Sequence, residues 1–219
     1  MKFKYLSILI AVGSLIGLYG LSLISQPPQI SLSQLPAYNG QQVLVQGIVT
    51  EYRTTASGSQ LITIKDREND TCSAVLYIAG SVAVEYGDVV QAVGEVQKYN
   101  EQWELSVSNP QSVTLVEKWT NTSFPLWQLA EYPGKYLNTN VNITGVVAQK
   151  QTSSFLLRDT AGSYSLDVSY DASDGSDFSN NDVVAVAGRF IYDAHLLRYY
   201  LEVTAPTHGI WTITRWEHA

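Results

Sequence analysis

One phrase of this sequence occurs twice, and the repetition constrains the fold more than any other feature. Residues 87–96 read GDVVQAVGEV, and residues 181–190 read NDVVAVAGRF. Each phrase places an Asp before a run of β-branched and small residues, and a Gly later in the run. Such a run between turn residues is typical of a buried β-strand. A chain of 219 residues that repeats it in this way is expected to contain two copies of one small domain.

Other strand-like segments repeat in the same order. The openings of the two copies, around residues 32–38 and 126–132, are the best candidates for short helices, and no sustained helical period follows residue 25. Gly47 and Gly145 fall in mid-strand, where a small barrel needs a sharp bend. The pattern predicts an all-β fold of two domains, 34–119 and 125–216, each with five short strands. The matching segments are 43–49 with 141–147, 61–66 with 155–159, 105–107 with 201–203, and 117–119 with 214–216.

The predicted strand order is that of a small closed Greek-key barrel. The repeated phrase resembles the fourth strand of the OB-fold superfamily of the nucleic-acid-binding, anticodon-binding type, which often reads Gly-Asp-x-Val-x-Val-x-Gly-x-Val. Residues 87–96 match this pattern closely, and residues 181–190 match it with Asn181 and Phe190 at the two ends. The chain also resembles archaeal membrane-anchored proteins with extracytoplasmic OB domains. The resemblance implies two tandem five-stranded OB-fold barrels and names no ligand, because the matching residues are structural.

The first 25 residues are markedly apolar. Lys2 and Lys4 precede an uncharged run from Tyr5 to Ile24, which as a continuous helix would cross a bilayer core of about 30 Å. We therefore expect a signal anchor or transmembrane helix over residues 1–25 and a spacer over residues 26–33. A cleaved signal peptide is the alternative.

The positive flank also predicts an orientation. By the positive-inside rule the N-terminus would lie inside. The expected protein is a single-pass protein of the cytoplasmic membrane with its C-terminal domains extracytoplasmic.

Aromatic and basic side chains near the expected ligand face are candidates for binding. OB-folds that bind single strands combine a positive groove with aromatic stacking platforms. The alternative that many of these rings simply fill the barrels stays open. The candidate ligand-binding residues are Tyr52, Lys65, Arg67, Tyr77, Tyr99, Trp103, Arg158, Tyr164, Tyr192, Arg198 and Tyr199.

The charge balance disfavours nucleic acid as the ligand. The chain has 13 Lys and Arg against 20 Asp and Glu, a net charge of −7, and acidic residues exceed basic ones in both halves. Nucleic-acid-binding domains usually carry a clustered basic stripe, because phosphate contacts supply most of the non-specific affinity.

Other chemistry has little support in the sequence. His195 and Tyr199 match the His-x-x-x-Tyr motif of the haem chaperones of cytochrome c maturation, but they precede the last strand of the expected barrel instead of following it. The acidic loop around residues 171–182 does not fit an EF-hand, since Tyr170 and Ala172 would occupy ligand positions. With three His and no nucleophile, zinc or phosphate-loop motif, we expect no enzyme, no metal and no cofactor.

The expected function is therefore binding or scaffolding. Tyr-rich surfaces of low charge suit contacts with a protein or a saccharide, because Tyr provides contact area at low entropic cost. We expect non-catalytic recognition of such a partner, or self-assembly, by a membrane-tethered tandem OB-fold protein. Single-stranded nucleic-acid binding is the alternative.

Overall fold

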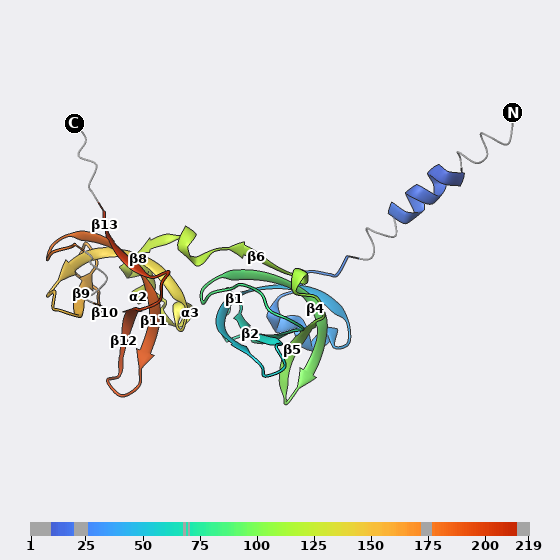
Figure 1. Ribbon diagram of the computed structural model, residues 1–219, viewed down its shortest axis with the longest axis horizontal. Coiled ribbons are helices and arrows are strands. Elements are labelled where there is room, and N and C mark those ends of the chain that lie inside the picture. Colours follow the sequence, from blue (N-terminus) through green and yellow to red (C-terminus); the bar gives the residue numbers. More distant parts are fainter. Residues whose placement is uncertain (1–9, 20–25, 68, 70, 172–176, 214–219) are drawn as a thin grey trace.

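The computed structural model describes residues 10–19, 26–67, 69, 71–171 and 177–213, and Figure 1 shows two β-rich bodies joined by an extended segment. A six-stranded sheet precedes that segment and a seven-stranded sheet follows it. The prediction of an all-β, OB-like fold is confirmed.

The first sheet closes on itself in the strand order of an OB-fold. Strands β1 to β5 follow the order β1-β2-β3-β5-β4, and a further pairing of β1 with β4 completes the barrel. All these pairs are antiparallel except β3 with β5, which is parallel. A sixth strand, β6, pairs with β4 outside the circle. The elements are η1 (Leu32–Tyr38), β1 (Gln42–Thr54), β2 (Gln60–Lys65), β3 (Ser73–Ile78), β4 (Val89–Tyr99), β5 (Gln102–Val107), η2 (Pro110–Ser112) and β6 (Val113–Glu117).

The second sheet repeats this pairing. Its order runs β8-β9-β10-β12-β11, β11 also pairs with β8, and β13 pairs with β11 as β6 does with β4. The parallel pair is again the third with the fifth strand, β10 with β12. The elements are η3 (Trp119–Asn121), β7 (Ser123–Pro125), α2 (Leu126–Glu131), α3 (Pro133–Tyr136), β8 (Asn140–Ala148), β9 (Ser154–Arg158), β10 (Ser165–Tyr170), β11 (Val183–Asp193), β12 (Arg198–Val203) and β13 (Gly209–Thr212).

Each sheet encloses its own apolar core. Val45, Ile64 and Leu105 are fully buried in the first, and Ile143, Leu157 and Leu201 in the second. These side chains come from the alternating inward positions of the strands, which is the periodicity that the sequence shows. The two expected short helices are also present, as η1 and α2.

The repeated glycines sit where neighbouring strands approach closely. A Cβ on Gly47 would lie 2.8 Å from the carbonyl oxygen of Lys65, and a Cβ on Gly145 would lie 2.6 Å from that of Arg158. The two positions are equivalent, so both barrels use the missing side chain for the same strand contact.

The repeated Asp residues hold the turns before β4 and β11. Asp88 Oδ2 accepts a hydrogen bond from the backbone N–H of Glu85 at 2.8 Å, and Asp182 Oδ2 accepts one from that of Ser179 at 2.7 Å. In the same turns Gly87 has φ +88° and Asn181 has φ +75°. Asn is one of the few other residues that tolerate this left-handed conformation, so the substitution keeps the turn.

The prediction of a membrane-spanning N-terminal helix is wrong. Within the first 25 residues the structure describes a helix only over residues 10–19, which rises about 15 Å, half the thickness of a bilayer core. No helix in the described part of the chain has both the length and the apolarity to span a membrane. The expected single-pass localisation and the membrane as a partner are therefore not supported. Residues 1–9 and 20–25 of the predicted segment lie outside the described residues.

Candidate functional site

A cleft of about 810 Å³ opens on the first barrel. Residues from the end of β1, from β2 and β3, and from the β4–β5 hairpin form its walls. Four aromatic side chains line it, those of Tyr52, Tyr86, Tyr99 and Trp103.

The aromatic side chains of the cleft come from two places, a contacting pair of tyrosines and the β4–β5 hairpin. The rings of Tyr52 and Tyr86 lie 4.8 Å apart between centroids at an angle of 33°. Tyr99 and Trp103 belong to a tight hairpin whose two central residues, Asn100 and Glu101, both have positive φ, at 45° and 65°. This turn matches the right-handed twist of the strands. Trp103 packs partly on the barrel core, whereas Tyr99 is 64% exposed. At this end of the cleft the Trp103 ring is therefore held by the core and the Tyr99 ring is open to a ligand.

The charges in the cleft are mixed. Glu51, Glu101 and Glu104 line it together with Arg53 and Arg189. Burial raises the pKa of Glu104 above its ordinary value, although a hydrogen bond from Gln97 opposes the shift. The walls therefore provide both donors and acceptors and no excess of positive charge.

Arg189 is the contribution of the second barrel to the cleft. It lies on β11, and its guanidinium carbon is 3.8 Å from the centroid of the Tyr86 ring. This cation–π contact connects the two barrels at the cleft wall.

The candidate residues of the first barrel divide between the cleft and other contacts. Tyr52, Tyr99 and Trp103 line the cleft. Lys65 Nζ donates to the carbonyl oxygen of Gly134 in the second barrel at 2.9 Å, Arg67 forms an ion pair with Glu117 at 3.1 Å, and the Tyr77 hydroxyl bonds the Ser59 hydroxyl at 3.1 Å. Their role in binding a ligand stays a prediction.

The candidate residues of the second barrel lie outside this cleft. Tyr192 and Tyr199 form a ladder with the buried Phe190, with centroids 5.0 Å apart between the two tyrosines and 5.2 Å apart between Tyr199 and Phe190. Arg198 pairs with Asp167 at 2.6 Å. Arg158 and Tyr164 are exposed at the two ends of the β9–β10 connection.

Tyr86 and Arg189 line the cleft but were not among the sequence candidates, and the same holds for its other charged residues, Glu51, Arg53, Glu101 and Glu104. A signal for Arg189 exists: in the repeated phrase it replaces Glu95 of the first copy, which reverses the charge at an otherwise equivalent position. Tyr86 directly precedes the phrase and has Asn180 as its counterpart.

The structure describes His195, which was considered for haem, and part of the acidic loop that was considered for calcium. His195 is exposed in the β11–β12 hairpin, where its backbone N–H donates to Asp193. Residues 172–176 of the acidic loop lie outside the described residues. No cluster of three potential metal ligands occurs among the described side chains.

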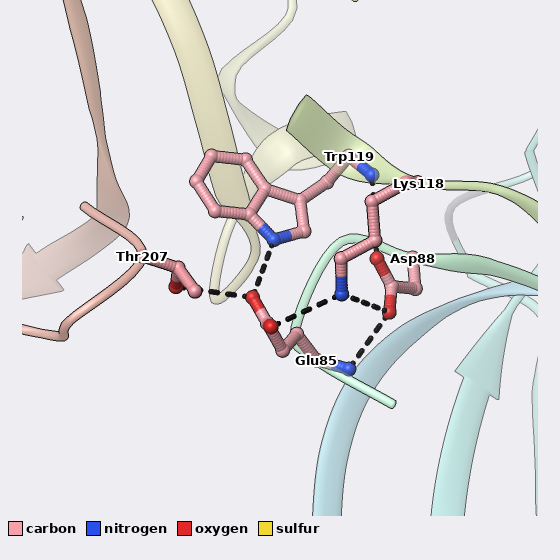
Figure 2. Close-up of polar contacts among 5 residues, drawn as sticks. All are labelled: Glu85, Asp88, Lys118, Trp119 and Thr207. Carbon is pink, nitrogen blue, oxygen red and sulfur yellow. Dashed lines mark hydrogen bonds and ion pairs between the residues drawn. The ribbon is translucent and has the colours of Figure 1, made fainter. Parts of the chain in front are cut away.

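A network of polar contacts holds the two barrels together, as Figure 2 shows. Asp88 is fully buried and forms an ion pair with Lys118 at 3.0 Å, and Lys118 also pairs with Glu85 at 3.1 Å. The carboxylate of Glu85 accepts from the Trp119 indole at 2.8 Å and from the Thr207 hydroxyl of the second barrel at 3.1 Å. One carboxylate thus joins the end of the first barrel to the β12–β13 turn of the second.

The pKa of Glu85 makes this network sensitive to acid. Burial would raise that pKa, but hydrogen bonds from Trp119, Lys118 and Thr207 outweigh burial and place it below the ordinary value of 4.5. A carboxyl group with a lowered folded-state pKa stabilises the fold fully above its unfolded pKa, and this contribution is lost as pH falls through the folded value.

We therefore expect Glu85→Gln to be less stable than wild type at neutral pH and to lose less stability on acidification below about pH 4.5. Urea unfolding at several pH values measures the difference. The exposed Glu131→Gln provides the control and should follow the wild-type pH profile. Parallel pH profiles for wild type and Glu85→Gln would contradict the expectation.

Comparison with known proteins gives no family for the chain. No family model matches it, and no curated protein matches it. Among solved structures, a putative aspartyl-tRNA synthetase from Leishmania major Friedlin matches with a TM-score of 0.35 and 17% identity, over 45% of this chain and 22% of the synthetase. The telomere capping protein Ten1 from S. pombe matches with a TM-score of 0.28 and 13% identity, over 41% of this chain and 81% of Ten1. A murine DNA binding protein bound with double-stranded DNA matches with a TM-score of 0.33 and 9% identity, over 81% of this chain and 99% of that one.

Proposed function

We propose that this protein is a non-catalytic recognition protein whose first barrel binds a short oligosaccharide in the cleft between Tyr52 and Trp103. The observation that carries the proposal is the convergence of four aromatic side chains on one cleft of about 810 Å³ with mixed charge. A volume of this size suits a ligand of a few sugar rings.

The position of the cleft supports a binding role. OB-folds bind oligonucleotides and oligosaccharides on the face of strands two and three, between the loops that join strands one and two and strands four and five. The cleft occupies this region, since β2, β3 and the β4–β5 hairpin line it.

The chemistry of the walls favours a sugar over a polyanion. Aromatic rings offer flat apolar faces to the C–H faces of pyranose rings, and the carboxylates of Glu51 and Glu104 accept hydrogen bonds from hydroxyl groups. A single-stranded nucleic acid brings one phosphate per nucleotide, and three carboxylates on the walls oppose that charge. Single-stranded nucleic acid is the alternative that the experiment below separates from a saccharide.

The test is a calorimetric titration against neutral hexasaccharides of glucose, mannose and N-acetylglucosamine, and against a thymidine oligonucleotide. We expect binding to at least one hexasaccharide, with little dependence on salt. Tyr99→Ala and Trp103→Ala should each weaken it about tenfold or more. Stacking of a nucleobase on an aromatic side chain contributes about 1–3 kcal/mol, and we expect a sugar face to gain a similar amount.

Two controls keep this result interpretable. Tyr99 is exposed, so its removal leaves the core intact even where Trp103→Ala loses stability. Trp127→Ala removes a half-exposed Trp of α2, outside the cleft, and should bind as wild type. Tight oligonucleotide binding that falls steeply with salt, or unchanged affinity in Tyr99→Ala, would reject the saccharide proposal.

A further inference from the structure

We propose that the cleft is completed by the second barrel, and that Arg189 binds the carboxylate of an acidic sugar at that end of the ligand. This inference rests on the proposed saccharide function and specifies the class of saccharide. It makes the cleft a two-barrel site.

Arg189 reaches the cleft from a rigid position. It lies within β11, opposite Asn140 of β8 and Glu202 of β12 in the two ladders. Its guanidinium covers Tyr86 at 3.8 Å, and Tyr86 in turn contacts Tyr52 at 4.8 Å between centroids. The guanidinium and the two rings form one continuous wall from the second barrel to the first.

The charge of Arg189 is available to a ligand. Arg67, Lys118 and Arg198 each pair with a carboxylate of the protein. In the described part of the chain no such ion pair involves Arg189, even with its cross-strand neighbour Glu202, and its buried Nε has no hydrogen-bond partner. A guanidinium presents a planar set of donors that matches a carboxylate in a bidentate geometry.

Away from Arg189 the cleft walls carry more carboxylates than cations, with Arg53 as the other basic residue among the lining side chains. Glu51, Glu101 and Glu104 line the walls, so a ligand with charge along its whole length meets repulsion there. A saccharide with one uronic acid at its end can place its carboxylate against Arg189. Its other rings are neutral, so they are not repelled by the carboxylates of the walls.

The repeat shows that the barrel fold does not require an arginine at this position. The first barrel carries Glu95 at the equivalent place, between Gly94 and the buried Val96. Arg189→Gln is therefore expected to leave the second barrel folded, which circular dichroism checks.

The experiment compares two trisaccharides that differ in one group. One ends in a uronic acid, and the other is the same molecule with that carboxyl reduced to a primary alcohol. Wild type should bind the acid about tenfold more tightly than the alcohol, the usual value of a hydrogen-bonded charged pair. Arg189→Gln should bind both alike, with its affinity for the alcohol within about threefold of wild type, and Arg189→Lys should retain part of the preference.

Arg158→Gln is the matched control, since it removes an exposed arginine of the same barrel that does not line the cleft. It should keep the full preference for the acid. Equal binding of acid and alcohol by wild type overturns the Arg189 inference and leaves the saccharide proposal standing. An equal loss of affinity for both trisaccharides in Arg189→Gln also overturns it, because Arg189 would then act only on the barrel contact. Binding of neither trisaccharide, together with no binding of the hexasaccharides, overturns the proposed function itself.

Discussion

Asp88→Ala is expected to lower the free energy of unfolding by about 3 kcal/mol, because it removes a buried carboxylate that accepts hydrogen bonds from two backbone N–H groups and pairs with Lys118. The carboxylate of Asp88 is fully buried and accepts from the backbone N–H of Glu85 at 2.8 Å and from that of Trp119 at 3.3 Å. Lys118 Nζ donates to the same carboxylate at 3.0 Å. Without this carboxylate, the backbone N–H groups of Glu85 and Trp119 lose their acceptor, whereas Lys118 keeps its ion pair with Glu85. A buried donor without a partner is costly. Urea unfolding measures the loss.

The second copy supplies an internal control for this variant. Asp182 has the same place in the repeated phrase and accepts from Ser179, but it is only half-buried. Asp182→Ala should therefore cost about 1 kcal/mol, the value of one hydrogen bond. If the two alanine variants lose the same stability, the ion pair with Lys118 contributes nothing beyond the turn.

Trp119→Ala is expected to cost about 3–5 kcal/mol and to loosen the two barrels from each other. The side chain is 5% exposed, and its indole N–H donates to Glu85 at 2.8 Å. Its ring meets the imidazole of His208 in the second barrel edge to face, with centroids 5.9 Å apart. The residue therefore contacts both barrels, and its removal leaves a cavity between them.

Two measurements detect this effect. Small-angle X-ray scattering should show a larger radius of gyration for Trp119→Ala, and thermal unfolding should separate into two transitions. Trp119→Phe keeps the apolar volume and loses the hydrogen bond, so a smaller loss of about 1–2 kcal/mol is expected. Trp211→Ala, at a half-exposed Trp of β13, should leave both measurements near wild type. An unchanged scattering profile for Trp119→Ala would contradict the assigned role.

The sequence predicts the barrels well because their determinants are local. A β-strand is specified by alternation, a turn by Asp and a residue that tolerates positive φ, and a close strand contact by Gly, as at Asp88, Gly47 and Asn181. These determinants also recur in the second copy, so each is seen twice. The same local reading failed for the membrane span expected within residues 1–25, since no helix among the described residues is both long and apolar enough to cross a bilayer.

The cleft was predictable only in part. Tyr52, Tyr99 and Trp103 lie at strand ends that the fold places on one face, so their convergence follows from the strand order. Arg189 and Tyr86 are far apart in the chain and meet only because the barrels dock. That docking depends on contacts of Trp119 and of Glu85 with Thr207. The repeat matches 117–119 with 214–216, but this match does not indicate that Trp119 contacts the second barrel.

The turn before β4 also lies directly against the backbone of the second barrel. A Cβ on Gly87 would lie 2.5 Å from the carbonyl oxygen of Asn140, whereas the second copy carries a full side chain at the equivalent Asn181. Glycine in the first copy therefore serves two purposes, because it adopts the left-handed turn and leaves room for the neighbouring barrel. The second copy needs only the turn, which asparagine also provides.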